Sequence, residues 1–335
     1  MKTIPWALSA VLASCPVWAA AQAVTVYGIA DVFVEAARAG QGTVTRVESG
    51  GIAQSRLGFT GQEDLGGGLK AVFTLESGFA YDTGTTGSAF WSRQAFVGLS
   101  SPAWGSVTLG HQYTPLFLTT YAFDAFGLGN SGNYWNLSQY STFWVSNAVV
   151  YETPVWSGWS ARLLYAPPEQ GSGIGRYTAG SLNYTRGALN IVASYDEQTI
   201  RRSGPAARHA TLGGSYGFSA FKLFLGLESI QDADPVEASN HDASLVTVGA
   251  HVPVTTTGKF VGSVTHRDDG SAARQDATQW AVGYFESLSK RTTLYTTYGQ
   301  IHNRNGAAFG IGYTPIDVLA GHTVKSLQVG VAHTF

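Results

Sequence analysis

Residues 69–76 read LKAVFTLE, a stretch in which apolar and polar side chains alternate. On an extended chain, one face of this stretch is leucine, alanine and phenylalanine, whereas the other is mostly polar and includes Lys70 and Glu76. A period of two residues is the signature of a β-strand with one apolar face, and a helical stripe at spacing three and four is absent here. The same alternation recurs at 159–165, 189–195 and 221–228.

The composition favours strands that lie in a membrane. Only 13% of the 335 residues are charged, against about a quarter in an average soluble domain, and 13% are aromatic. Beyond Ala23, no apolar run approaches the roughly 18 residues that a membrane-spanning helix requires. Alternating strands can nevertheless cross an outer membrane if they close into a barrel, because every backbone group then bonds to a neighbouring strand.

The connections between the expected strands alternate between short and long. The short ones are 64–68, 101–105, 186–187, 217–220 and 289–291. The long ones are 38–50, 80–89, 112–146, 166–176, 197–208, 230–242 and 267–277. Outer-membrane barrels are built with short periplasmic turns and long outer loops, so this rhythm predicts a single barrel domain over residues 24–335.

The strand number requires one decision. About seventeen segments resemble strands by their alternation, and one of them, Ala307–Tyr313, is rich in glycine and followed by Pro315. Because single-chain bacterial barrels have even strand numbers, we assign 303–324 to a long outer loop. The sequence therefore predicts an all-β fold, a transmembrane antiparallel β-barrel of sixteen strands, with fourteen or eighteen as the alternatives.

The N-terminus predicts a secretion signal over residues 1–23. A basic start is followed by a mostly apolar stretch at 4–17 and by small residues, with cleavage expected after Ala21 or Ala23. The single cysteine, Cys15, lies inside this segment, where a loose lipobox with an acylated cysteine is the alternative. Cleavage after Ala23 leaves a chain without disulfides or cysteine-ligated metal. Loss of the signal's lysine moves the formal charge from −2 to −3, which excludes a basic nucleic-acid footprint.

Five segments carry motifs that point to one family. They are 24–31 (VTVYGIAD), 55–71 (SRLGFTGQEDLGGGLKA), 93–99 (RQAFVGL), 107–115 (VTLGHQYTP) and 329–335 (VGVAHTF). They resemble the opening strand, the second and third strands with their turn, the fourth and fifth strands, and the last strand of the general porins of β-proteobacterial and neisserial type, a Gram-negative outer-membrane porin family. The middle of the chain resembles this family mainly in its rhythm.

The resemblance implies a water-filled channel for passive diffusion of small hydrophilic solutes and ions across the outer membrane. It also implies a homotrimer embedded in outer-membrane lipids, with the third loop folded into the lumen, where an acidic loop facing wall arginines sorts solutes by charge. The last strand, with His333 and the terminal Phe335, is the signal that the barrel-assembly machinery reads in such proteins. Packing in the interfacial aromatic girdle is the other role open to Phe335.

Four residues form the candidate constriction by this resemblance: Arg56, Arg93, His111 and Asp124. The two arginines match wall arginines of the family, although Arg93 shares its strand parity with apolar residues. His111 stands where the family commonly has arginine. Asp124 lies in FDAFG (123–127), close to the family's loop-three Asp-Pro-Phe-Gly, and is the only ionised residue between His111 and Glu152.

Aromatic side chains replace charges in the expected third loop. They include Tyr121, Phe123, Phe126, Tyr134 and Trp135. We therefore hypothesise a weakly charged, aromatic-rich constriction suited to neutral or amphipathic solutes. The alternative is that most of these rings pin the loop to the wall or belong to interfacial girdles.

Two other functions fit a barrel. An outer-membrane enzyme of lipase or protease type would need catalytic residues, but no Gly-x-Ser-x-Gly elbow stands out and no HExxH motif occurs. A closed structural or adhesion barrel would need an occluded lumen, which a sixteen-strand barrel is too wide to fill with wall side chains alone. The sequence predicts a channel that is not an enzyme and that needs no cofactor, metal or nucleic acid.

Overall fold

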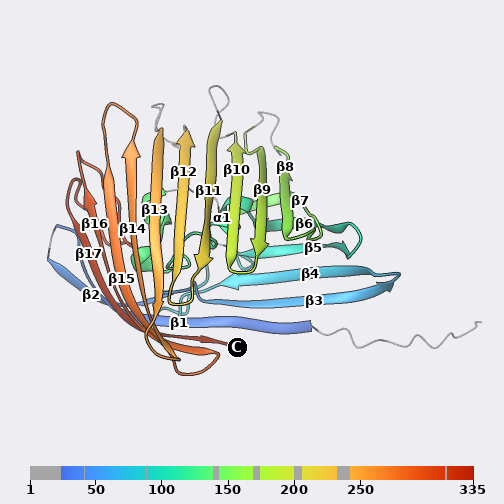
Figure 1. Ribbon diagram of the computed structural model, residues 1–335, viewed down its shortest axis with the longest axis horizontal. Coiled ribbons are helices and arrows are strands. Elements are labelled where there is room, and N and C mark those ends of the chain that lie inside the picture. The colour runs from blue at the N-terminus through green and yellow to red at the C-terminus, as the bar shows by residue number, and fades with distance from the viewer. Residues whose placement is uncertain are drawn as a thin grey trace, which may run out of the picture.

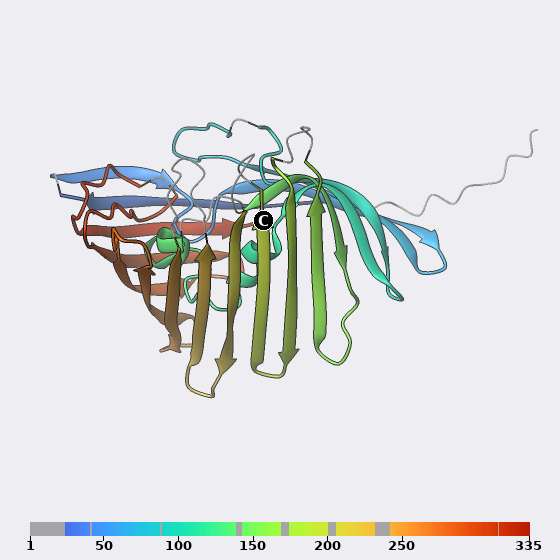
Figure 2. The same cartoon turned by 90° about the horizontal axis from the view of Figure 1, so that it is seen from above.

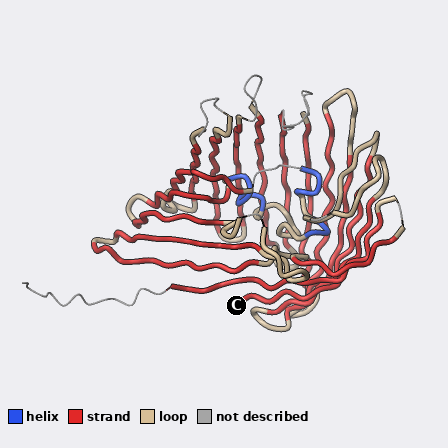
Figure 3. The backbone as a smooth tube through the Cα atoms, turned by 180° about the vertical axis from the view of Figure 1, so that it is seen from behind, coloured by secondary structure: helices blue, strands red, loops and turns tan. Residues whose placement is uncertain are grey.

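Antiparallel strands run along the whole described chain and curve into one wall around three short helices (Figures 1 and 3). The computed structural model describes residues 24–40, 42–87, 89–138, 143–168, 174–199, 206–231, 242–313 and 315–335. The expected signal segment 1–23 lies outside these residues. None of the helices within the described ranges has the length and hydropathy of a membrane span.

The strands account for most of the chain. They are β1 (Val24–Arg38), β2 (Thr43–Ser49), β3 (Arg56–Gly66), β4 (Leu69–Gly78), β5 (Gln94–Ser101), β6 (Gly105–Tyr113), β7 (Trp144–Glu152), β8 (Trp159–Ala166), β9 (Tyr177–Arg186), β10 (Leu189–Gln198), β11 (Ala207–Gly217), β12 (Lys222–Gln231), β13 (Ala243–Pro253), β14 (Gly258–Asp269), β15 (Ala277–Ser287), β16 (Thr292–Asn303) and β17 (Val324–Thr334). The helices are α1 (Pro115–Thr120), the 3-10 turn η1 (Asn130–Gly132) and α2 (Trp135–Ser138).

The first and last strands close the barrel. β1 pairs along one edge with β17, from Ile29 opposite Thr334 to Arg38 opposite Lys325. Its other edge pairs with β3 through its first half and with β2 through its second half. β2 and β3 therefore share one position in the wall, and the seventeen strands of the described residues fill sixteen positions.

This arrangement confirms the prediction of a sixteen-strand transmembrane barrel and corrects one expected loop. The stretch 38–50 is largely strand, because β2 turns back onto β1 and extends the wall. The break between β2 and β3 is held by the buried carboxylate of Asp31, which accepts hydrogen bonds from the amides of Ile52 (2.8 Å) and Ala53 (2.9 Å). The expected long loop at 303–324 is confirmed, since β16 ends at Asn303 and β17 begins at Val324.

Side chains alternate across the wall as the sequence predicts. On β17, Leu327, Val329 and Val331 are exposed on the outer face, whereas Ser326 and Gln328 are buried on the inner face. Strands β12 to β16 follow the same alternation, and their exposed large hydrophobic residues are mainly leucine and valine. An apolar outer face matches a hydrocarbon surrounding, and a polar inner face matches a water-filled lumen.

The connection between β6 and β7, called loop three here, enters the barrel (Figure 2). Its helix α1 begins at Pro115 after Thr114, whose hydroxyl caps the amide of Phe117 (3.2 Å), and packs against β9 and β10. Farther along the loop, the Ser131 hydroxyl contacts Thr297 (2.6 Å) on the opposite wall. Loop three thus crosses the lumen, as the resemblance implies.

Candidate pore constriction

A buried carboxylate on the inner wall organises the charges beside loop three. Glu76 of β4 accepts hydrogen bonds from Arg93 Nε (2.7 Å) and from the hydroxyls of Tyr113 and Tyr27 (2.9 Å each). Arg56 Nε lies 3.7 Å from the same carboxylate. We call these five residues the Glu76 cluster. The sequence placed Glu76 on a polar strand face, but its partners come from three other strands and from the residue before β5, so pattern alone did not single it out.

Arg93 is fully engaged within this cluster. Its side chain is 3% exposed, and its guanidinium also donates to Gln54 and to Tyr113 and lies 5.3 Å from the Trp144 ring. The residue precedes β5, whose ladder begins at Gln94, so it is not bound by the parity that turns Val97 outward. Because other side chains enclose its guanidinium, Arg93 makes little direct contact with solutes in the lumen.

Arg56 keeps more contact with the lumen. It opens β3 on the inner face, and its side chain is 22% exposed, against 5% for its partner Glu76. The ion pair between them is looser than the pair with Arg93, at 3.7 Å against 2.7 Å. Of the two predicted wall arginines, Arg56 is therefore the one that a passing solute can reach.

The structure does not bring His111 together with the two arginines. His111 lies opposite Ala95 in the β5–β6 ladder and shares the outward parity of Leu109. Its ring contacts the Ser146 hydroxyl (3.0 Å) and the Ser92 carbonyl oxygen (3.3 Å). The neighbouring strand bulges here, because one residue of β6 faces two residues of β7.

Asp124 lies inside loop three. Its carboxylate accepts hydrogen bonds from the backbone amides of Phe126 (2.9 Å), Leu128 (3.0 Å) and Tyr134 (3.3 Å). Burial raises the pKa of this carboxyl to about 6, against the lowering effect of the three amides. The side chain is 3% exposed, so it fixes the shape of the loop from within and does not project into the lumen.

Four of the five predicted loop-three rings pack inward. Phe123, Phe126, Tyr134 and Trp135 are buried, whereas Tyr121 is 45% exposed. Tyr134 donates its hydroxyl to Glu228 of β12, whose carboxylate also contacts His209 (2.9 Å). These four rings hold the loop against the wall, which leaves Tyr121 as the member of this set that faces the lumen.

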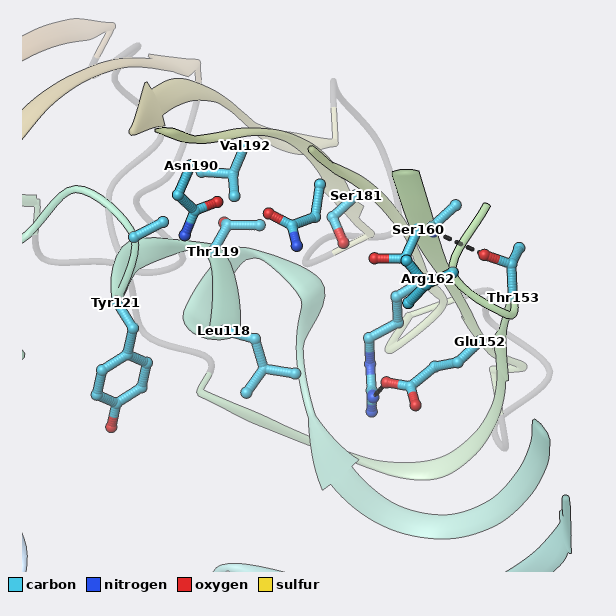
Figure 4. Close-up of a pocket in the computed structure, with 14 residues that line it drawn as sticks. Leu118, Thr119, Tyr121, Glu152, Thr153, Ser160, Arg162, Ser181, Asn190 and Val192 are labelled. Atoms are coloured by element: carbon cyan, nitrogen blue, oxygen red, sulfur yellow. Dashed lines mark hydrogen bonds and ion pairs between the residues drawn. The ribbon is translucent and has the colours of Figure 1, made fainter. Parts of the chain in front are cut away.

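Open space lies beside α1, in two adjoining cavities of about 470 and 710 Å³. Both are lined by Leu118, Glu152 and Arg162, so they form neighbouring parts of the lumen. Figure 4 shows the smaller cavity, with the Arg162 guanidinium paired with the Glu152 carboxylate. Sequence reasoning missed this pair. The two residues are direct partners in the β7–β8 ladder, so their side chains lie on one face, and both line the two cavities. In the parts of the chain described here, no three histidine, cysteine or acidic side chains gather into a metal site.

The C-terminal residues lie at the outer face. Phe335 is 44% exposed, and its backbone exchanges two hydrogen bonds of 3.2 Å with Gly28 at the start of the chain. His333 contacts the Thr292 hydroxyl at 2.9 Å. The terminal ring is thus available to contacts outside the barrel.

Comparisons with known proteins give one family. A family model described as "Gram-negative porin" matches residues 7–306. Outer membrane porin protein 32 of Delftia acidovorans is 30% identical over 346 aligned positions, covering 97% of this chain and 98% of that protein. Major outer membrane protein P.IB of Neisseria gonorrhoeae is 36% identical, covering 88% of this chain and 93% of that protein. The solved structure of an anion-selective porin from Comamonas acidovorans matches with a TM-score of 0.85 at 29% identity, covering 94% of this chain and 100% of that one.

Proposed function

Because this chain belongs to the family of Gram-negative porins, we propose that its channel narrows to an eyelet of low net charge, lined by Arg56, Tyr121 and the Arg162–Glu152 pair. The protein is an outer-membrane porin, and small hydrophilic solutes and ions diffuse passively through its barrel. The proposal concerns how this eyelet selects among them.

The pairing of charges around the lumen carries the proposal. In the Glu76 cluster, two arginines face one carboxylate, which leaves one uncompensated positive charge. Arg162 and Glu152 cancel each other, and Asp124 is enclosed by the loop. The groups named here leave one net positive charge, which supports a preference for anions that is weaker than a cluster of unpaired arginines at the same place would give.

The uncharged part of the eyelet comes from α1. Leu118 and Tyr121 are the large side chains that this helix and its C-cap leave exposed, at 37% and 45%. An apolar side chain and an amphipathic ring beside a nearly neutral wall favour neutral or amphipathic solutes. In this proposal, Asp124 shapes the eyelet from inside loop three, and His111 supports the wall from its outer face.

Single-channel recording in asymmetric KCl tests the proposal. A low net charge predicts a small reversal potential of the sign that marks anion preference. A reversal potential close to the chloride limit would refute it. The same recordings test a homotrimer, which we also propose, because three channels in one particle open in groups of three.

We further propose that the chain is made with a signal peptide at 1–23 and that the barrel-assembly machinery reads its last strand. The outward exposure of Phe335 supports the second proposal, since a reader outside the barrel needs access to the ring. The relative from Delftia acidovorans is named as an outer membrane porin, and we propose that this chain acts as a channel without enzymatic activity. Esterase and protease assays on the purified protein test that point.

A further inference from the structure

The smaller lumen cavity has one polar wall, and we call it the side pocket. It lies between α1 and the inner faces of β7 to β10 (Figure 4). Its wall carries four uncharged polar side chains on three adjacent strands, namely Ser160, Ser181, Asn183 and Asn190. Ser160 and Asn183 are direct partners in the β8–β9 ladder, so their side chains stand next to each other.

The polar groups of this wall are not used by the protein itself. Within the described residues, the side chains of Ser160, Ser181 and Asn183 make no hydrogen bond, and Asn190 only accepts one, from Thr185 at 3.4 Å. Some other hydroxyls of the inner wall bond to one another, as Thr60 does with Thr74 (3.2 Å) and Thr247 with Thr265 (2.8 Å). The side pocket thus keeps donors and acceptors available to whatever enters it.

The opposite side of the pocket is apolar. Leu118 and Ala122 come from α1 and the residues after it, and Tyr121 adds an aromatic ring (Figure 4). Thr119 also lines the pocket, and its hydroxyl bonds to the Leu116 carbonyl (2.8 Å) and to the Ser194 hydroxyl of the wall (3.3 Å). A solute between the two sides meets hydrogen-bonding groups on one side and carbon surfaces on the other.

The side pocket offers no uncompensated charge. Its charged side chains are Glu152 and Arg162, and these form an ion pair with each other. An anion or a cation would have to break this pair to find a counter-charge, whereas an uncharged solute would not. The volume of about 470 Å³ falls within the roughly 300–1,000 Å³ of small-molecule sites.

We propose that the side pocket is a binding site for an uncharged carbohydrate of one or two rings. The hydroxyls of such a ring donate to and accept from the asparagine and serine side chains, and its C–H face packs on Leu118 and Tyr121. This inference rests on the proposed function and deepens it. A neutral sugar reaches the pocket through the eyelet, and an eyelet of low net charge admits uncharged solutes.

Current recording of the full-length mature protein in planar bilayers tests the site, with maltose as the probe. Binding in the lumen predicts brief current interruptions whose frequency saturates as the maltose concentration rises. An ether of similar size without hydroxyls, such as hexaethylene glycol dimethyl ether, should cause none. Equal interruption by the ether, or none by maltose, would overturn the proposal. Interruption by a zwitterionic amino acid in place of maltose would also overturn it.

Two variants locate the site. Ser181→Ala and Asn183→Leu each remove hydrogen-bonding groups and should weaken maltose binding about threefold to tenfold. Ser106→Ala removes a hydroxyl from the larger cavity only and should leave maltose binding unchanged. Ser181→Ala is the smaller change and covers the case in which Asn183→Leu disturbs folding. Unchanged maltose binding in Ser181→Ala and Asn183→Leu would overturn the assignment.

The reversal potential in KCl without sugar separates this inference from the proposed function. A small reversal potential without maltose interruptions rejects the side-pocket inference alone. A large reversal potential rejects the low-charge eyelet, whatever maltose does.

Discussion

Replacing Arg56 by glutamine should remove most of the anion preference of this channel. Arg56 is 22% exposed and bonds loosely to Glu76, whereas Arg93 already neutralises that carboxylate at 2.7 Å. The variant keeps a hydrogen-bonding side chain of similar length. It should therefore alter the charge at the eyelet more than the structure around it.

The magnitude follows from Coulomb's law. A chloride ion passing about 7 Å from one unit charge gains about 0.6 kcal/mol in water and about 2.4 kcal/mol at an effective dielectric constant near 20. Because potassium is repelled by the same amount, the lower value separates the two ions by about 1.2 kcal/mol. Salt at about 0.1 M, with a Debye length near 10 Å, roughly halves this difference at 7 Å and leaves about a threefold preference for chloride over potassium, which is the native ratio that we expect.

The assay is the reversal potential of single channels across a KCl gradient, measured for the native chain and for Arg56→Gln. The variant should give a permeability ratio close to one. Lys325→Gln is the matched control, because it removes one positive charge from an exposed position on the outer face and should leave the ratio unchanged. A native ratio far above threefold, or a ratio that Arg56→Gln does not change, would refute the reasoning.

Three further predictions concern stability, loop position and assembly. Arg93→Gln should lower the free energy of unfolding by about 3–5 kcal/mol, measured by urea titration, because it leaves the buried Glu76 without its close cation. Gly226→Ala should lower conductance, because a methyl group at Gly226 would collide with the Phe123 ring and push loop three away from the wall into the lumen. Deleting Phe335 should reduce the amount of folded protein in the outer membrane while synthesis stays unchanged.

A control variant or a contradicting result can be named for each of these three predictions. Gly42→Ala adds a methyl group where no atom lies within 4 Å, so its conductance should equal that of the native protein. A urea midpoint for Arg93→Gln equal to the native midpoint would show that Arg93 is not needed to neutralise Glu76. Normal membrane insertion without Phe335 would remove the assembly role of the terminal ring.

The sequence was sufficient for the barrel and for loop three. Alternation gave most strands, and the even-number rule correctly kept Ala307–Tyr313 out of the wall. The polar residues at 38–50 predict a loop, whereas the structure places β2 there, paired with β1. Local composition does not indicate this pairing, because it depends on which part of the β1 edge β3 leaves unpaired.

The constriction was harder to predict for the same reason. Parity assigns a residue to one face of a regular strand, but Arg93 precedes its strand and so escapes the rule. His111 was expected at the constriction from its place in a motif, yet it stands beside a bulge with the outward parity of Leu109. The ion pairs of Glu76 and of Glu152 join residues on different strands, so they become visible only when the register is known.

Because β1 pairs with β17, the barrel can close only after β17 has been synthesised. The first strand to leave the ribosome has no partner on one side until the last strand has been synthesised, 286 positions after Arg38 at Val324. A nascent or truncated chain therefore exposes two unpaired edges, which invite association with other chains. Closure across so long a separation is slow. We expect the unfinished chain to depend on periplasmic chaperones until its final residues reach the membrane.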